Sequence, residues 1–303
     1  MLHESLTALQ ITPDGIYVDA TFGRGGHTAA ILAQLNRDGR VIAFDQDPEA
    51  VAVAQQRFAN EPRLTIYHAP FTELNQTLNE LTLTGKINGI LLDLGVSSPQ
   101  LDDANRGFSF RHEGPLDMRM NPHSGISAAE WLAHANAEEI ALVLKTYGEE
   151  RFAKRIATAI VSQRQSVAKI TTTTALAAVV AEAMPHHERD KHPATRTFQA
   201  IRIYINRELE ALDQVLTQVN SALVQGGRLV VISFHSLEDR RVKRFMRDAA
   251  HGDHAPIKLP LRSDQLAPPQ LRLIGKAQQA SASEVAANPR ARSAVLRVAE
   301  RMA

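Results

Sequence analysis

Short apolar runs alternate with amphipathic stretches over the first hundred residues of the chain. The apolar runs have the length and composition of buried strands and lie at residues 16–20, 40–45, 64–68 and 87–94. Helical stretches separate them and begin near His27, Pro48 and Thr72. Proline suits a first helical turn. This alternation predicts a parallel sheet wound with crossover helices.

The pattern changes at the end of the fourth apolar run. Residues 95–125 are rich in Gly, Pro, Ser, Asp and Asn, and the segment is too long for an ordinary connection. Helical stretches then follow without any strand pattern, at residues 128–134, 137–147, 149–163 and 174–184. We therefore predict an inserted all-helical domain at residues 111–196, within a discontinuous domain formed by residues 1–110 and 197–303.

The last hundred residues return to the sheet. Residues 197–224 carry apolar positions three and four apart with no Gly or Pro, which predicts one long amphipathic helix. Gly226 and Gly227 end this helix, and residues 228–234 follow as a fifth strand. Two further strands are predicted at residues 271–274 and 293–298, where their pairing would give the sheet an antiparallel edge.

Composition narrows the class of protein. The chain has 303 residues, 44% of them hydrophobic, and no cysteine. The lack of cysteine excludes disulfides, thiolate metal sites and cysteine nucleophiles. No uncharged apolar stretch approaches the roughly 18 residues of a membrane span, and no basic segment precedes an apolar run at the N-terminus. These features predict a cytoplasmic protein without a membrane partner.

Charge is unevenly distributed along the chain, although the net charge is only +1. Residues 1–144 carry −9, residues 145–207 carry +6, residues 208–239 carry −4 and residues 240–303 carry +8, counting Lys and Arg against Asp and Glu. Two basic blocks beside an acidic body indicate a surface for a polyanion, and solvated helix faces would give the same totals. The pattern nominates a nucleic acid as partner.

A glycine turn follows the first predicted strand at residues 23–26 and opens into a helix. Turns in this place bind nucleotides in doubly wound sheets. The position of the third glycine of the dinucleotide fingerprint is occupied by Thr28, which weakens the prediction of a pyrophosphate site. Asp45 ends the second predicted strand, where a carboxylate can accept hydrogen bonds from both hydroxyls of a ribose. NAD and S-adenosylmethionine both remain possible ligands at this point.

Several long strings carry a resemblance to a known family. They lie at residues 21–27, 93–100, 107–110, 114–120, 148–153, 192–196 and 233–240. Together they resemble the bacterial RsmH (MraW) family, whose members transfer a methyl group from S-adenosyl-L-methionine to the N4 amine of a cytidine in the decoding region of 16S ribosomal RNA. The resemblance implies an α/β fold with a doubly wound, Rossmann-like class I methyltransferase sheet and an inserted all-helical domain that recognises RNA.

The resemblance also implies roles for individual residues. The cofactor-binding set is Gly23, Gly25, Gly26, His27, Asp45, Phe71, Asp93 and Gln100. Within it, Gly25, Gly26 and His27 line the methionine end of the cofactor, and Asp93 is also the catalytic residue. The competing interpretations are that His27 is a first-turn residue, Phe71 a core aromatic and Asp93 a loop cap. The family has a short segment before the stretch that begins here at Met1, so we expect this start to be shorter than usual.

The chemistry of the reaction agrees with this reading. Methylation of a pyrimidine carbon 5 needs a covalent adduct, normally with a cysteine, whereas an exocyclic amine needs only to lie in line with the methyl group. Asp93 could accept hydrogen bonds from that amine. We predict that Phe108 or Phe110 stacks on the extruded cytosine, with the alternative that both anchor the loop.

The candidate RNA contacts come from the basic blocks and the shared strings. They are Phe108, Phe110, Arg119, Arg151, Lys191, His192, Arg196, His235, Arg290 and Arg292. No metal site is predicted, because the histidines lack metal-binding spacing. Ser236 is predicted to cap the helix after the fifth strand.

Two rival functions and the oligomeric state stay open at this stage. An oxidoreductase of the same fold and a non-catalytic ribosome-assembly or RNA-binding factor are the rival functions. The partner is expected to be 16S rRNA within the small ribosomal subunit, and a homodimer is left open.

Overall fold

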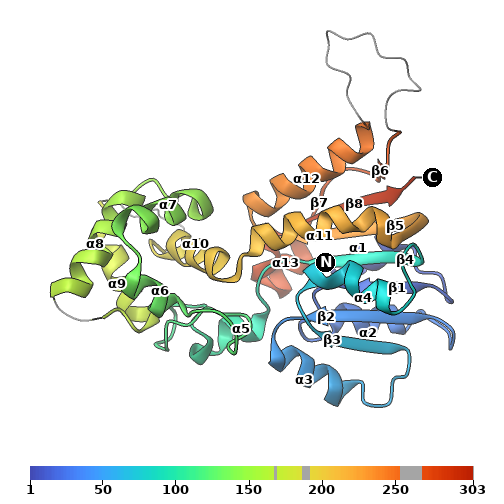
Figure 1. The fold of residues 1–303 in the computed structure, drawn as a ribbon, viewed down its shortest axis with the longest axis horizontal. Coiled ribbons are helices and arrows are strands. Elements are labelled where there is room, and N and C mark those ends of the chain that lie inside the picture. The colour runs from blue at the N-terminus through green and yellow to red at the C-terminus, as the bar shows by residue number, and fades with distance from the viewer. Residues whose placement is uncertain (167–168, 186–191, 253–267, 303) are drawn as a thin grey trace, which may run out of the picture. The chain divides into compact units, whose positions relative to one another are not determined.

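A computed structural model describes residues 1–166, 169–185, 192–252 and 268–302. The chain divides into two compact units (Figure 1). The sheet unit consists of residues 1–95 and 209–303, and the helical unit consists of residues 96–208. The sequence predicted the boundaries near residues 110 and 197 instead. The segment just after residue 95 belongs to the helical unit because Phe108 packs in its core and Val96 and Leu101 pack against that core.

The sheet unit is built on a mixed sheet with the strand order β3-β2-β1-β4-β5-β8-β6, and β7 pairs with β8. The strands are β1 (Ile16–Asp19), β2 (Arg40–Asp45), β3 (Leu64–His68), β4 (Ile87–Asp93), β5 (Leu223–Ser233), β6 (Leu271–Leu273), β7 (Gln278–Gln279) and β8 (Val295–Arg301). β1 to β5 pair in parallel, and β8 pairs antiparallel with β5 and β6. The predicted α/β sheet with an antiparallel edge is confirmed.

Both faces of this sheet are covered by helices because successive strand residues point to opposite sides. The helices of this unit are α1 (Leu2–Leu9), α2 (Gly26–Leu32), α3 (Pro48–Arg57), α4 (Leu74–Glu80), α11 (Glu208–Ala222), α12 (Ser236–His251) and α13 (Ala282–Ala287). On one face of the sheet, Val231 packs with α4, α11 and α12. On the other face, its neighbours Val230 and Ile232 pack with α1 and α2. Burial on two faces explains why these strands read as continuous apolar runs.

The helical unit surrounds a separate apolar core. Its helices are α5 (Ser98–Asp102), α6 (Ala128–His134), α7 (Ala137–Gly148), α8 (Ala153–Ser166), α9 (Thr173–Ala183) and α10 (Thr195–Asn206). Asn136 caps α7 and shares a capping box with Glu139, and Ser127 does the same for α6 with Glu130. The predicted run of helices is confirmed, although α8 begins four residues later than expected.

The predicted single helix over residues 197–224 is wrong. The structure has two helices there, α10 and α11, which meet at Arg207. Arg207 has a left-handed backbone (φ 49°), which ends a helix even though the apolar spacing continues across the break. Among the described residues, no helix has the length and apolar character needed to cross a bilayer.

Candidate active site

The carboxyl ends of β1, β2, β4 and β5 meet at one edge of the sheet unit, which we call the carboxyl edge. β1 lies between β2 and β4, so the chain leaves β1 at the point where the strand order reverses. Crevices at such points bind ligands in open α/β sheets. Three of these strands end in an aspartate, namely Asp19 in β1, Asp45 in β2 and Asp93 in β4.

The glycine turn after β1 brings backbone close to this edge. Gly23 and Gly25 have left-handed φ values of 57° and 72°. A Cβ on Gly25 would lie 2.6 Å from the ring of Phe22, so no other residue fits there without displacement. A Cβ on Gly26 would meet nothing within 4 Å, which leaves open space in front of its backbone. The turn is therefore fixed in shape and accessible to a ligand.

Asp45 fixes the turn and faces the same space. Its Oδ2 accepts a hydrogen bond from the Gly23 amide at 2.7 Å, and its Oδ1 accepts one from the Asp47 amide at 2.9 Å. Burial raises the pKa of Asp45 to about 6, against the lowering effect of these two amides. Each carboxylate oxygen can accept one more hydrogen bond, which a pair of ribose hydroxyls would supply.

Asp93 and His27 form a second polar pair on this edge. Asp93 Oδ2 lies 3.6 Å from His27 Nδ1, and the Asp93 amide donates to Thr21 Oγ1 at 2.7 Å. Burial raises the pKa of Asp93 to about 6, and the nearby charge of His27 opposes that rise. Asp93 Oδ1 and His27 Nε2 are shielded from solvent, and neither has a hydrogen-bond partner within the described structure.

Asp19 is a buried carboxyl that the sequence analysis missed. It is fully buried and accepts hydrogen bonds from the Thr28 hydroxyl at 2.7 Å and the Thr21 amide at 3.2 Å. Burial raises the pKa of Asp19, and the charge of His27 has a smaller, opposite effect on this pKa. Asp19 thus ties the end of β1 to the start of α2 beneath the glycine turn. The sequence could have indicated Asp19, because it ends a predicted strand as Asp45 and Asp93 do.

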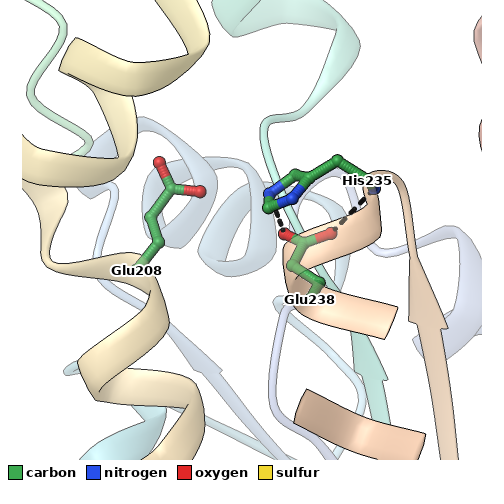
Figure 2. A group of neighbouring side chains, drawn as sticks. All are labelled: Glu208, His235 and Glu238. Carbon is green, nitrogen blue, oxygen red and sulfur yellow. Dashed lines mark hydrogen bonds and ion pairs between the residues drawn. The ribbon is translucent and has the colours of Figure 1, made fainter. Parts of the chain in front are cut away.

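His235 follows β5 on the same edge. The structure places it at the N-cap of α12, with Ser236 as the first helical residue, so the prediction that Ser236 is the cap is wrong. Glu238 accepts the backbone N–H group of Phe234 at 2.8 Å. It also accepts that of His235 at 3.3 Å (Figure 2). Its other oxygen lies 3.1 Å from His235 Nε2. Glu238 and the buried, unpartnered hydroxyl of Ser233 were not identified from the sequence.

The two remaining cofactor predictions, Phe71 and Gln100, make other contacts in the structure. Phe71 opens a short 3-10 helix after β3 and packs against the core shared with α4 and α11, which also fits the interpretation of a core aromatic. Gln100 lies in the helical unit, where its Oε1 accepts the Ser97 amide at 2.8 Å in a capping box. The roles of Phe71 and Gln100 in cofactor binding therefore stay predictions.

Phe108 has a place that fits the alternative of a loop anchor, and its stacking on a base stays a prediction. Its side chain is 6% exposed in the core of the helical unit, so it anchors the loop. Phe110 stacks on His192 with ring centroids 4.4 Å apart and contacts Phe198 edge-on at 4.9 Å. One face of the Phe110 ring is therefore already covered by His192. The stacking of Phe110 on a base stays a prediction.

The basic candidates fall into two groups. Arg119 pairs with Asp117 through two hydrogen bonds of 2.8 and 2.6 Å, which raises its pKa and lowers that of Asp117. This pair holds the loop before α6. Arg151, Arg290 and Arg292 are exposed, and Arg196 is partly buried in α10. Lys191 lies outside the described residues.

The carboxyl edge has the features of a nucleotide-cofactor site. Its backbone is open at Gly26, its carboxyl at Asp45 can accept further hydrogen bonds, and its polar atoms on His27 and Asp93 lack partners. A buried polar atom without a partner costs about 1–3 kcal/mol, so a ligand that pairs with these atoms would recover that cost. The residues present fit a ligand with a ribose and a positively charged group.

Comparisons of the sequence with known proteins identify its family. A model of the MraW methylase family matches residues 1–302. The chain is 57% identical over 303 residues to a protein of Thioalkalivibrio sulfidiphilus and 58% identical over 303 residues to one of Thiobacillus denitrificans, and it covers 96% of each. Both relatives are named ribosomal RNA small subunit methyltransferase H. A solved rRNA methylase from Streptococcus thermophilus is 14% identical, with 99% of this chain and 94% of that chain covered and a TM-score of 0.40.

Proposed function

The chain belongs to the MraW methylase family, and on this premise we propose that it methylates the N4 amine of a cytidine in the decoding region of 16S ribosomal RNA. The coarser function follows from the relatives: the protein is an S-adenosylmethionine-dependent methyltransferase of small-subunit ribosomal RNA. The observation that carries the proposal is the carboxyl edge, where Asp45, His27 and Asp93 surround an open glycine turn.

We assign the cofactor contacts as follows. Asp45 accepts hydrogen bonds from the ribose hydroxyls, and Gly25, Gly26 and His27 contact the methionine end. S-adenosylmethionine supplies a methyl group on a positively charged sulfur. Ionised Asp93, whose side chain is partly exposed and whose Oδ1 is shielded from solvent, attracts that charge.

Asp93 also positions the acceptor amine. Its Oδ1 has no partner among the described residues, so it can accept a hydrogen from the N4 amine and turn the nitrogen lone pair toward the methyl carbon. The chain has no cysteine, so a thiolate adduct with the pyrimidine ring is not available. Methylation at an exocyclic nitrogen needs none.

The helical unit and the exposed arginines are proposed to hold the RNA. Residues 145–207 carry a net charge of +6, and Arg290 and Arg292 are exposed on the sheet unit. Cations that contact phosphates give affinity without reading the base sequence. The selection of one cytidine would then come from the shape of the RNA around the carboxyl edge.

One experiment tests the proposed atom and site together. The protein is incubated with small subunits that lack the modification and with isotopically labelled S-adenosylmethionine, and the RNA is digested to nucleosides for mass spectrometry. The proposal predicts label in N4-methylcytidine from the decoding region. Label in another nucleoside, or in another region, would refute it.

A further inference from the structure

His235 is a buried histidine at the carboxyl edge that the assignments above leave without a chemical task. Its side chain is 10% exposed. Both ring nitrogens are shielded from solvent and make no hydrogen bond in the parts of the chain that the structure describes, although Nε2 lies 3.1 Å from a carboxylate oxygen of Glu238. A buried ring nitrogen without a hydrogen bond lowers the stability of the folded protein. Its presence here points to a hydrogen-bond partner that arrives with the substrate.

The fold places His235 beside the proposed reaction centre. β4 and β5 are neighbouring parallel strands in which Asp93 pairs with Ile232, and the Leu94 amide donates to Ile232 O at 3.0 Å. A Cβ on Gly95 would lie 3.8 Å from the Phe234 ring. His235 is the next residue. Burial is the main cause of the raised pKa of Asp93, and the charge of Glu238 adds to it.

Glu238 sets the hydrogen position on the imidazole ring. One of its oxygens accepts the backbone N–H groups of Phe234 and His235. The other oxygen lies 3.1 Å from His235 Nε2, and Figure 2 shows this contact. An ionised carboxylate has no hydrogen to donate, so the ring hydrogen belongs on Nε2. Nδ1 then presents a free lone pair. Glu208, the first residue of α11, also has a carboxylate oxygen within 4.8 Å of the ring nitrogen of His235 and of a Glu238 oxygen (Figure 2). Asp93, which lies beside His27, is the titratable group at the end of the neighbouring strand β4.

Methylation of an amine requires an acceptor for one proton. When the nitrogen–carbon bond forms and the sulfur–carbon bond breaks, the sulfur becomes neutral and the positive charge moves to the nitrogen. The amine loses that charge only by releasing a hydrogen ion. Asp93 is better suited to orienting the amine, because its ionised form also balances the positive sulfur.

We propose that His235 accepts this proton at Nδ1, with Glu238 stabilising the resulting imidazolium. The inference rests on the proposed function and adds a residue to it. The neutral ring takes up one hydrogen ion as the methylated amine becomes neutral, so charge and atoms balance. Asp93 orients, and His235 receives the proton.

The first test replaces the ring without removing its hydrogen-bonding shape. In His235→Asn the amide can occupy the place of Nδ1 and cannot take up a proton. The rate constant for a single turnover should fall about 100-fold, as for the loss of a general base. The dissociation constant for S-adenosylmethionine should stay within about twofold, because the residue acts after the cofactor is bound. His251→Asn, at the other end of α12, is the matched control and should keep the wild-type rate.

The second variant separates the charge of Glu238 from its structural role. Glutamine also serves at the third position of a capping box, so Glu238→Gln keeps the acceptor for the start of α12. It removes the negative charge that faces His235. The rate should fall about tenfold with an unchanged melting temperature, which a purely structural role would not produce.

The third measurement needs neither a variant nor turnover. Nitrogen-15 NMR of histidine-labelled, ligand-free protein should show the hydrogen of His235 on Nε2. A hydrogen on Nδ1, or a His235→Asn rate within about threefold of wild type, would overturn the inference. If instead the wild-type protein forms no N4-methylcytidine on small subunits, the proposed function fails, and the NMR result still decides the state of the ring.

Discussion

The sheet unit and the helical unit treat buried polar groups differently. In the helical unit, buried Arg106 donates to the Met120 carbonyl at 2.8 Å, and Asn206 bridges Met118 and Met120 with two bonds of 2.7 Å. At the carboxyl edge, His27, Asp93, Ser233 and His235 each keep a buried atom without a partner among the described residues. Only Glu150 and Thr197 do so in the described part of the helical unit.

The difference separates residues that build the molecule from residues kept for a ligand. Loops of the helical unit use their polar side chains to hold their own shape, including Arg119, which the sequence had suggested as an RNA contact. The carboxyl edge leaves hydrogen-bonding capacity unused. Changes in the helical unit should therefore act first on stability, and changes at the carboxyl edge should act on binding and turnover.

The largest expected effect is in the helical core. Phe108→Ala should lower the free energy of unfolding by about 3–5 kcal/mol, because it removes a buried aromatic side chain, and urea unfolding would measure this loss. Phe108→Leu should cost much less. If Phe108→Ala abolished methylation and left stability unchanged, Phe108 would act on the base and the comparison between the units would break.

Asp93→Asn should lower the turnover number about 100- to 1000-fold, because the amide cannot hold the charge or accept from the amine in the same way. The affinity for cofactor should change by less than about fivefold, since Asp45 and the glycine turn remain. Quench-flow methylation assays and calorimetry measure the two quantities. Normal turnover in this variant would remove Asp93 from the reaction.

Asp45→Asn should instead weaken cofactor binding about 10- to 100-fold, as expected when hydrogen bonds to a charged acceptor are lost. Calorimetric titration with S-adenosylhomocysteine measures the change without turnover. Asp38→Asn, on the surface after α2, serves as the control and should bind as the wild type does. An unchanged affinity in Asp45→Asn would place the ribose elsewhere.

The raised pKa values of Asp45 and Asp93, both about 6, predict a pH dependence of binding. The cofactor favours both groups in ionised form, so its binding releases protons below pH 6. A group with this pKa that must be ionised gives a rise of about tenfold from pH 5 to pH 7, and Asp93 contributes less than about fivefold, so the affinity should rise about 10- to 50-fold over this range and level off above it. The rise should be smaller in Asp45→Asn. A flat profile in the wild type would show that neither carboxyl changes protonation on binding.

The smallest expected effect concerns an exposed cation. Arg292→Gln should weaken binding to small subunits only about threefold and should reduce the salt dependence by about one phosphate contact. Filter binding across a range of salt concentrations measures both. Unchanged affinity and slope would identify Arg292 as a solvated surface residue.

The sequence was sufficient for the sheet and for the carboxylates at its edge. Strands buried on both faces give long apolar runs, and the aspartates that end β2 and β4 stand out at the end of such runs. The break at Arg207 could not be predicted, because the apolar spacing continues through it and only the backbone angle changes.

The contacts of the candidate site residues could not be predicted for a similar reason. Nothing in the sequence distinguishes a phenylalanine that stacks on a base from one that anchors a loop, since Phe108 and Phe110 lie two residues apart in the same long polar segment. The pairing of Arg119 with Asp117 depends on how the loop folds back. Glu238 was missed because its contact with His235 depends on where α12 begins.

The most direct test of the account is a crystal structure of the protein with bound S-adenosylmethionine. The account predicts both ribose hydroxyls on Asp45, the methionine end against Gly25, Gly26 and His27, and the methyl-bearing sulfur next to Asp93. A cofactor bound away from the glycine turn, or Asp93 turned away from the sulfur, would contradict it.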